Sequence, residues 1–398
     1  MNLLFIVIII PCILAQNWLP YEKKVIYRAP ASSMHRPSRD TSTILKTLTA
    51  NGSIFHDIVV DRSYRGTRSI DDSNAELSSL IKAESKELAR RQKFKHGDNP
   101  LSIDLWHHHD LGEVKNFIDS VATRNPELAQ KFTIGKSSEG RKIAGLKLSK
   151  GNEAQKKSIV VMAGAHAREW VTVTAAMGLV LKLLKDKSLI KMFDIYVIPV
   201  LNPDGYVYSW ETDRLWRKTR SNRNNKLCPG RGVDVNRNFG YNWDSACELC
   251  YDEYPGRTPF SEPESINLAT FLARLNQSSS ISAFFDVHSY GNELLLPGGD
   301  CKHKSKLDKV NREASQAFIS ATTSTFKAGS VCDIVPYTVH GASIDYVQQV
   351  LKVPIVMSPE LGSYTHGFMP KPEEIYTSVT DFVHGFMAVA KFAFQHNI

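Results

Sequence analysis

The sequence predicts an α/β protein whose central sheet is mixed but mainly parallel, with helices on both faces. Three short, continuously apolar segments at 158–163, 281–287 and 353–357 have the length and composition of buried strands. Longer apolar or amphipathic segments at 170–184 and 374–394 have the length of helices. Strands that are apolar on both faces and alternate with helices are typical of parallel sheets covered on both sides.

The same pattern defines one large domain over residues 98–398. Its first helix is predicted over 111–122, because Asp110 and Glu113 stand three positions apart as in a capping box. A further apolar strand is predicted at 195–200. No internal repeat interrupts this order.

Residues 1–16 form an apolar run that ends in small and polar residues, which is typical of a cleaved secretory signal. The run is too short to span a membrane, and no later stretch is long and apolar enough to do so. The protein is therefore predicted to be secreted and extracellular, without a membrane anchor.

Residues 17–97 are polar and basic, with one strand candidate at 54–60 and one helix candidate at 75–88. This segment has too little apolar surface to build a robust core alone. Arg90 and Arg91 precede a polar stretch, as in exposed sites that trypsin-like proteases cleave. From these residues alone, an interdomain linker is an equally good interpretation.

Two other features do not indicate a function. The net charge of +8 comes without a long basic stripe interleaved with aromatic residues, and a secreted chain rarely meets nucleic acid, so no nucleic-acid partner is expected. The histidine run at 106–110 is discounted as a metal site, because adjacent side chains do not converge easily on one ion and the run abuts a helix start. A surface role is predicted for this run.

Four polar residues lie at or just beyond the carboxyl ends of the three apolar strands. His166 and Glu169 follow the first strand, His288 closes the second and Glu360 follows the third. Ligands of open α/β sheets bind beyond this edge, so the four side chains are expected to share a site. Two imidazoles and one carboxylate are the ligand set of a catalytic zinc ion with an open coordination position, whereas an isolated H-x-x-E pattern would be a weak signal.

The motifs around these residues follow one another in a fixed order, and together they resemble the zinc metallocarboxypeptidases of the pancreatic carboxypeptidase A/B type, the funnelin family. The resemblance extends over roughly the last three quarters of the chain. The motifs are GAHAREW (164–170), DRLWRKTR (213–220), VDVNRNFG (233–240), DVHSY (286–290), PYTVHGASID (336–345) and PELGSY (359–364).

The resemblance implies the zinc-carboxypeptidase fold and one Zn²⁺ per chain, held by His166, Glu169 and His288. It implies hydrolysis of the C-terminal bond of peptides and proteins. It also favours 17–97 as an inhibitory prosegment that a trypsin-like protease removes near residues 90–91. A monomer is the default expectation.

The resemblance assigns the reacting groups as well. Glu360 matches the family's catalytic carboxylate, which takes a proton from the attacking water and passes it to the departing amine. Arg217 matches the residue that polarises the carbonyl together with zinc, a role suited to a guanidinium that stays charged. Asp234 matches the carboxylate that orients His166, although an aspartate in a structural turn is a fair alternative.

A second group of residues implies recognition of a free C-terminus. Asn236 and Arg237 match the family's carboxylate clamp, with Arg237 offering a bidentate pair, and Tyr337 matches the mobile tyrosine that closes over it. Without these three residues, the zinc site would be compatible with an endopeptidase or an amide deacylase. The residues that match substrate subsites further out are Arg168, Ser289 and Tyr290.

The C-terminal side chain of the substrate is expected to be aliphatic or aromatic. By resemblance, Ile344 stands where B-type enzymes, which prefer Lys or Arg, carry an acid, and an apolar floor cannot compensate a buried cation. Two departures leave a B-type preference open, because Ala342 replaces a usual glycine and Asp300 is expected near the pocket wall. A catalytically weak member that only binds peptides is the other alternative, although no zinc ligand or catalytic carboxylate is missing.

A secreted chain is expected to pair its cysteines. Once the cysteine of the signal is removed, five remain and one is left over. By resemblance, Cys301 pairs with Cys332. The resemblance also pairs Cys228 with Cys250 and leaves Cys247 over, but a Cys228–Cys247 pair is an open alternative.

Overall fold

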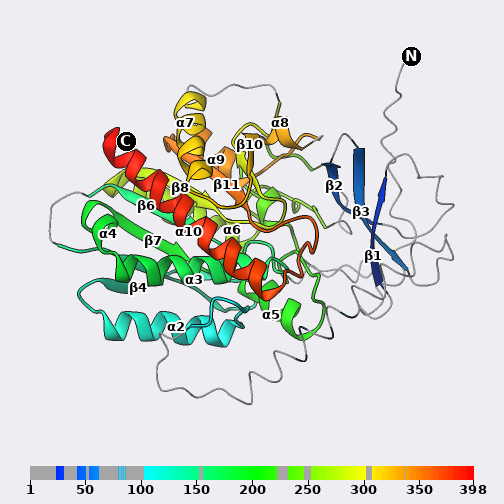
Figure 1. Ribbon diagram of the computed structural model, residues 1–398, viewed down its shortest axis with the longest axis horizontal. Helices are drawn as coiled ribbons and strands as arrows, with labels where there is room; N and C mark the ends of the chain where they lie inside the picture. Colours follow the sequence, from blue (N-terminus) through cyan, green and yellow to red (C-terminus); the bar gives the residue numbers. More distant parts are fainter. Residues whose placement is uncertain are drawn as a thin grey trace.

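The computed structural model describes an N-terminal group of strands and a large α/β domain (Figure 1). The predicted signal, the predicted cleavage site at Arg90 and Arg91, and the three cysteines of 228–250 lie outside the described residues. The described residues are the backbone of 24–30, 43–50 and 53–61, single positions between 79 and 86, and 103–151, 156–221, 232–245, 252–301, 307–335 and 337–398.

The N-terminal strands form an antiparallel sheet in the order β1-β3-β2. Strand β3 confirms the strand predicted at 54–60, and the described positions within 75–88 are helical. The segment therefore has a small sheet of its own rather than the single strand predicted. Its strands are β1 (Lys24–Pro30), β2 (Thr43–Ala50) and β3 (Ser53–Asp61).

The large domain is built on an eight-stranded sheet in the order β10-β9-β11-β8-β6-β7-β5-β4. The central strands β11, β8, β6 and β7 run parallel, whereas β4, β5 and the β9–β11 pair add antiparallel contacts. The predicted mixed, mainly parallel sheet is confirmed. The strands are β4 (Ala129–Lys136), β5 (Lys142–Leu148), β6 (Ser158–Met162), β7 (Asp194–Ile198), β8 (Ile281–Asp286), β9 (Glu293–Leu296), β10 (Lys327–Ser330) and β11 (Ile355–Glu360).

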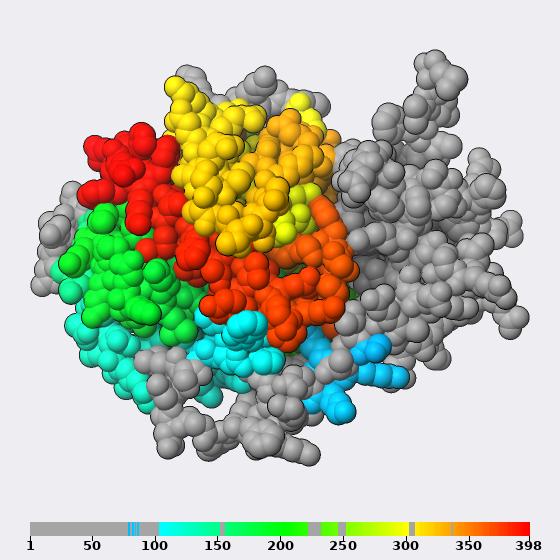
Figure 2. All heavy atoms as spheres, viewed as in Figure 1, coloured from blue at the N-terminus to red at the C-terminus, as the bar shows by residue number. Residues whose placement is uncertain are grey.

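Helices cover both faces of this sheet. In Figure 1, α10 crosses one face beside α3, and Figure 2 shows the side chains of α7 in yellow and α10 in red filling that side of the molecule. The capping box predicted for α2 is present, because Asp110 and Glu113 each accept a hydrogen bond from the other's backbone. The helices are α2 (Leu111–Arg124), α3 (Trp170–Lys185), α4 (Ser188–Met192), α5 (Pro203–Glu211), α6 (Pro263–Ser279), α7 (Asp308–Ser320), α8 (Val331–Ile334), α9 (Ser343–Gln349) and α10 (Pro372–Gln395), with a 3₁₀ turn η4 (Val235–Arg237).

The central strands are largely apolar because each faces a core on both sides. Successive strand side chains point to opposite faces, so Ile159 and Val161 join the core beneath α3 and α10, while Val160 and Met162 join the core beneath α6 and α9. All five residues of β6 are buried. Burial on both faces fixes the register of these strands and hence the place where each one ends.

The surface role predicted for the histidine run is wrong. His108 and His109 are each 3% exposed, and the His108 ring packs edge-on against Trp170 with 5.7 Å between ring centroids. The Nε2 of His109 lies 3.0 Å from the carbonyl oxygen of Asp104. The run packs against the beginning of α3, a position that its own polar composition does not indicate.

The predicted disulfide between Cys301 and Cys332 is confirmed, with 5.4 Å between the two Cα atoms. It joins the segment after β9 to helix α8. Across the described part of the chain, no helix is both long and apolar enough to cross a membrane.

Glu264, in the first turn of α6, carries a buried carboxyl group. Burial raises its pKa to about 7, and the charges of Glu262 and Asp204 act in the same direction. The protonated form is therefore favoured in the folded protein. Glu264 therefore contributes most to stability below its ordinary pKa of 4.5, and this contribution is lost as the pH rises to about 7.

We expect Glu264→Gln to remove this pH dependence. At pH 4 the variant should nearly match the unaltered protein, whereas at pH 8 it should be more stable by up to about 3 kcal/mol, since one pKa unit corresponds to about 1.4 kcal/mol. Urea unfolding at both pH values measures the difference. Glu313→Gln, at an exposed position of α7, is the control, and equal stabilities of Glu264→Gln and the unaltered protein at pH 8 would contradict the prediction.

Candidate active site

Three neighbouring parallel strands bring the predicted residues to one edge of the sheet. His166 and Glu169 lie between β6 and α3, His288 follows β8, and Glu360 is the last residue of β11. The backbones of His288 and β11 are joined by two hydrogen bonds, from His288 N to Pro359 O at 2.8 Å and from Leu361 N to His288 O at 2.8 Å. The four residues therefore converge as their places at the strand ends predict.

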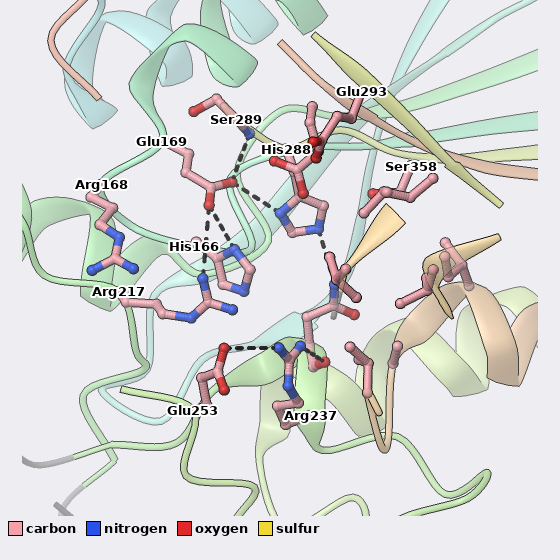
Figure 3. Close-up of a pocket in the computed structure, with 18 of the residues that line it drawn as sticks. His166, Arg168, Glu169, Arg217, Arg237, Glu253, His288, Ser289, Glu293 and Ser358 are labelled. Carbon is pink, nitrogen blue, oxygen red and sulfur yellow. Dashed lines mark hydrogen bonds and ion pairs between the residues drawn. The ribbon is translucent and has the colours of Figure 1, made fainter. Parts of the chain in front are cut away.

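His166, Glu169 and His288 form a compact group of metal-ligand atoms, all within 4.8 Å of one another. The Nδ1 of His166 lies 2.8 Å from Oε1 of Glu169, and the Nδ1 of His288 lies 2.9 Å from Oε2 (Figure 3). All three side chains are buried. Burial opposes ionisation of Glu169, but the two histidines hold its pKa well below the ordinary value.

This donor set fits a zinc ion. Two imidazole nitrogens and a carboxylate oxygen are ligand types that zinc takes in catalytic sites, and here the two Nδ1 atoms point at the same carboxylate. The far nitrogens of both rings also have acidic partners. His166 Nε2 lies 3.1 Å from Asp234 Oδ1, and His288 Nε2 lies 2.8 Å from Asp286 Oδ1. Such outer carboxylates orient ligating histidines and raise their basicity.

Arg217 lies beside this group and shares Asp234 with it. Its Nε and one terminal nitrogen contact Asp234 Oδ2 at 2.9 and 2.8 Å, and its other terminal nitrogen is 4.0 Å from Glu169 Oε1. Burial opposes the charge of this guanidinium, but Asp234 raises the pKa of Arg217 above the ordinary value. A fixed positive charge therefore stands next to the metal-ligand group.

Arg168 is almost completely buried and also faces the cavity. It donates to Asp252 at 2.9 Å and to the carbonyl of Leu215 at 3.2 Å, and its guanidinium lies 4.5 Å from the centre of the Phe368 ring. These contacts hold the arginine in one orientation.

Asn236 and Arg237 lie in the 3₁₀ turn η4 on the opposite side of the cavity. The Asn236 amide nitrogen is 3.1 Å from His288 Nε2, and its oxygen accepts from the backbone of Ser343 at 2.8 Å. Arg237 donates to the carbonyl of Asn236 at 3.0 Å and to Glu253 at 3.1 Å. Tyr337 is 39% exposed and lines the same cavity.

Nearly all the predicted site residues line one cavity that is open to solvent. Ser289 lines it, whereas Tyr290 and Asp300 do not. The Tyr290 ring is buried and packs on Phe368 with 4.7 Å between centroids. The apolar part of the lining consists of Leu295, Val331, Val335, Val339, Ala342, Ile344 and Phe368.

Three acidic residues of the site were not singled out from the sequence. Asp286 ends β8 and stands two positions before His288. Residues two apart in extended backbone point to the same side, and this spacing is the pattern from which a contact between Asp286 and His288 could have been predicted. Glu253 and Glu293 line the cavity but lie in segments whose sequence carries no comparable signal. Glu293 pairs across the strands with Glu360 and accepts a hydrogen bond from Tyr364.

Comparison with known proteins agrees with this geometry. The zinc carboxypeptidase family model matches residues 114–384. Carboxypeptidase O of Homo sapiens is 33% identical over 309 residues, covering 73% of this chain and 81% of that protein. Carboxypeptidase A2 of Rattus norvegicus is 34% identical over 285 residues, covering 68% of this chain and 66% of that protein.

A solved structure shares the fold over most of its length. The carboxypeptidase A of Helicoverpa armigera gives a TM-score of 0.77 at 26% identity, covering 89% of this chain and 91% of that one. With the three-residue metal site at the expected strand ends, these likenesses show that the chain belongs to the zinc carboxypeptidase family and is a metallocarboxypeptidase.

Proposed function

We propose that this protein is a secreted, monomeric exopeptidase that is made as a zymogen and releases aliphatic or aromatic residues from the C-termini of peptides and proteins. The observation that carries the proposal is the content of one cavity. A metal-ligand group, the carboxylate of Glu360 and the guanidinium of Arg237 all line it. Cleavage and recognition of a chain end can therefore take place side by side.

His166, Glu169 and His288 would hold one zinc ion. When bound, zinc supplies Lewis-acid polarisation of a carbonyl and lowers the pKa of a water molecule toward roughly 7. Asp234 and Asp286 keep the two imidazoles oriented so that each presents its Nδ1.

Glu360 acts as the general base and then as the general acid. Its place at the end of β11, with its backbone bridged to that of His288 and its side chain in the lining of the same cavity, supports this role. The carboxylate takes a proton from the water that attacks the scissile carbonyl and delivers it to the departing amine.

Arg217 stabilises the negative charge that develops on the carbonyl oxygen. Its contacts with Asp234 fix the guanidinium before the substrate arrives, so little rearrangement is needed during the reaction. Arg168 and Ser289 line the cavity at the outer subsites, and Tyr290 supports that wall by packing on Phe368.

The terminal carboxylate of the substrate binds Arg237 and Asn236, with Tyr337 closing over it. A planar guanidinium suits a carboxylate because it offers two parallel donors. The exposure of Tyr337 leaves its side chain room to move onto a bound substrate.

The preference for an apolar C-terminal residue rests on the lining near Ile344. This residue is 3% exposed and belongs to a cluster of buried apolar side chains that includes Val339 and Ala342. These three side chains offer no charge that could compensate a lysine or arginine side chain for its lost hydration. Asp300, which could have admitted a basic residue, is not among the lining residues.

Secretion and latency are proposed from the N-terminal quarter of the chain and from one disulfide. The apolar run at 1–16 supports export, and the disulfide between Cys301 and Cys332 suits an oxidising environment. The small sheet of β1 to β3 and the basic pair Arg90 and Arg91 precede the large domain, which is the arrangement expected of a removable prosegment. A trypsin-like protease is the proposed activator.

We expect release of the C-terminal residue from a peptide ending in Phe only after trypsin treatment of the purified chain and only while zinc is bound. A zinc chelator should abolish release and added zinc should restore it. Glu360→Gln should bind zinc as before but lower kcat by about 10³-fold, since it removes the general base. Undiminished turnover by this variant, or cleavage of a peptide whose C-terminus is amidated, would refute the proposal.

We expect Ile344→Asp to shift the substrate preference toward a C-terminal Arg. A buried carboxylate compensates the guanidinium, so the ratio of kcat/KM for peptides ending in Arg and Phe should rise about tenfold or more. Ile344→Asn, which has nearly the same shape but no charge, is the matched control. The proposed preference for aliphatic or aromatic C-terminal residues fails if the unaltered enzyme already releases Arg faster than Phe or Leu.

A further inference from the structure

Arg237, the proposed anchor for the substrate's chain end, already contacts a carboxylate in this structure. One terminal nitrogen of its guanidinium lies 3.1 Å from Oε1 of Glu253, and the other donates to the carbonyl of Asn236 at 3.0 Å (Figure 3). Both Arg237 and Glu253 line the cavity that holds the metal-ligand group. The carboxylate of Glu253 therefore stands where a peptide's terminal carboxylate would approach.

The two partners differ in their freedom to move. The side chain of Arg237 is 13% exposed and that of Glu253 is 42% exposed, so the carboxylate sits on the solvent side of the pair. The backbone next to Glu253 is held on both sides, because Asp252 pairs with Arg168 and the carbonyl of Tyr254 accepts from Asp234 N at 2.8 Å. Rotation of the Glu253 side chain can thus release Arg237 without a backbone change.

We propose that the carboxylate of Glu253 pairs with Arg237 in the free protein, in the place of the substrate's terminal carboxylate. Binding of a peptide chain end displaces Glu253 from Arg237. This inference rests on the proposed role of Arg237 in anchoring the chain end.

The negative charge of Glu253 balances the positive charge of Arg237 while no substrate is bound. Burial opposes the positive charge of Arg237, and Glu253 is the largest of the neighbouring charges that raise its pKa. A free peptide carboxylate can replace Glu253 without leaving the guanidinium unpaired. An amidated or internal segment carries no charge that could replace Glu253, so such a ligand leaves the pair of Arg237 and Glu253 in place. Only a free C-terminus therefore exchanges with Glu253.

Two other roles for Glu253 make different predictions. If Glu253 only positions Arg237, its removal should weaken the binding of carboxylates. If it contacts the side chain of a basic C-terminal residue, its removal should affect only peptides ending in Lys or Arg. Competition for Arg237 predicts instead tighter binding of every ligand that carries a free carboxylate.

The direct test is the binding of 3-phenylpropanoate, which combines a carboxylate with an aromatic ring, to the zinc-loaded full-length protein before and after trypsin treatment. Calorimetry should show that Glu253→Gln binds 3-phenylpropanoate about three- to fivefold more tightly. A partly exposed ion pair such as that of Arg237 and Glu253 is expected to change an equilibrium constant by up to about this factor. The uncharged 3-phenylpropanamide should not gain affinity. Glu313→Gln, which alters an exposed ion pair of α7, is the matched control and should change neither affinity.

A second variant isolates the pair itself. In an Arg237→Gln background, Glu253→Gln should produce no further change in the affinity for 3-phenylpropanoate, since the two effects act through one contact. For peptides ending in Phe or Leu, Glu253→Gln should lower KM by the same factor and leave kcat unchanged. An unchanged or weaker affinity for the carboxylate overturns the inference, as does an effect that survives in the Arg237→Gln background.

The binding measurement keeps this inference separate from the proposed function. A protein that releases no C-terminal residue but binds 3-phenylpropanoate more tightly as Glu253→Gln would refute the exopeptidase activity and support the competition. A protein that turns over peptides with unaltered KM in Glu253→Gln would support the activity and refute the competition.

Discussion

The carboxylate of Glu169, held between two buried imidazoles, is the interaction on which the rest of the site depends. Each of its oxygens meets one Nδ1 atom, from His166 and from His288, and these residues come from segments more than a hundred positions apart. Their meeting requires β6 and β8 to lie side by side in a defined register, which the apolar cores on both faces of the sheet impose. The chemistry of the site is thus a consequence of how the central strands are buried.

Around this carboxylate, acidic and basic groups alternate. Each imidazole has an acidic partner on its far nitrogen, and one of those partners, Asp234, also binds Arg217. Because each of these buried groups has an oppositely charged neighbour, the ion pairs offset part of the cost of removing the charges from water. In sequence order, the groups are His166, Glu169, Arg217, Asp234, Asp286 and His288.

In the large sheet, the sequence revealed the well-buried strands and missed the exposed or very short ones. Strands β6, β8 and β11 are largely apolar and buried, so their existence could be predicted, although β11 ends at Glu360, three residues beyond the predicted end at 357. Strand β4 is mostly exposed or half-buried, and β9 and β10 have only four residues, so neither periodicity nor length distinguishes them from loops. The burial of His108 and His109 also depends on tertiary packing that local composition does not encode.

The same limit applies to the site. The metal-ligand residues could be found because strand ends in an α/β sheet converge, whereas Glu253 reaches the cavity from a polar turn whose position depends on the whole fold. Tyr290 is the opposite case. Its place in the motif suggested a position at a substrate subsite, but its ring packs on Phe368 and does not line the cavity. Motif resemblance indicates which segments surround a site, but the direction of each side chain requires the three-dimensional structure.

The covalent link between Cys301 and Cys332 has a consequence for the apolar wall of the cavity. Cys332 belongs to α8, and Val331 and Val335, on either side of it, line the cavity. A cross-link restricts the alternative conformations of this wall. The entropy of ordering the wall is thereby lost during folding, so this side of the cavity is preorganised before any ligand binds.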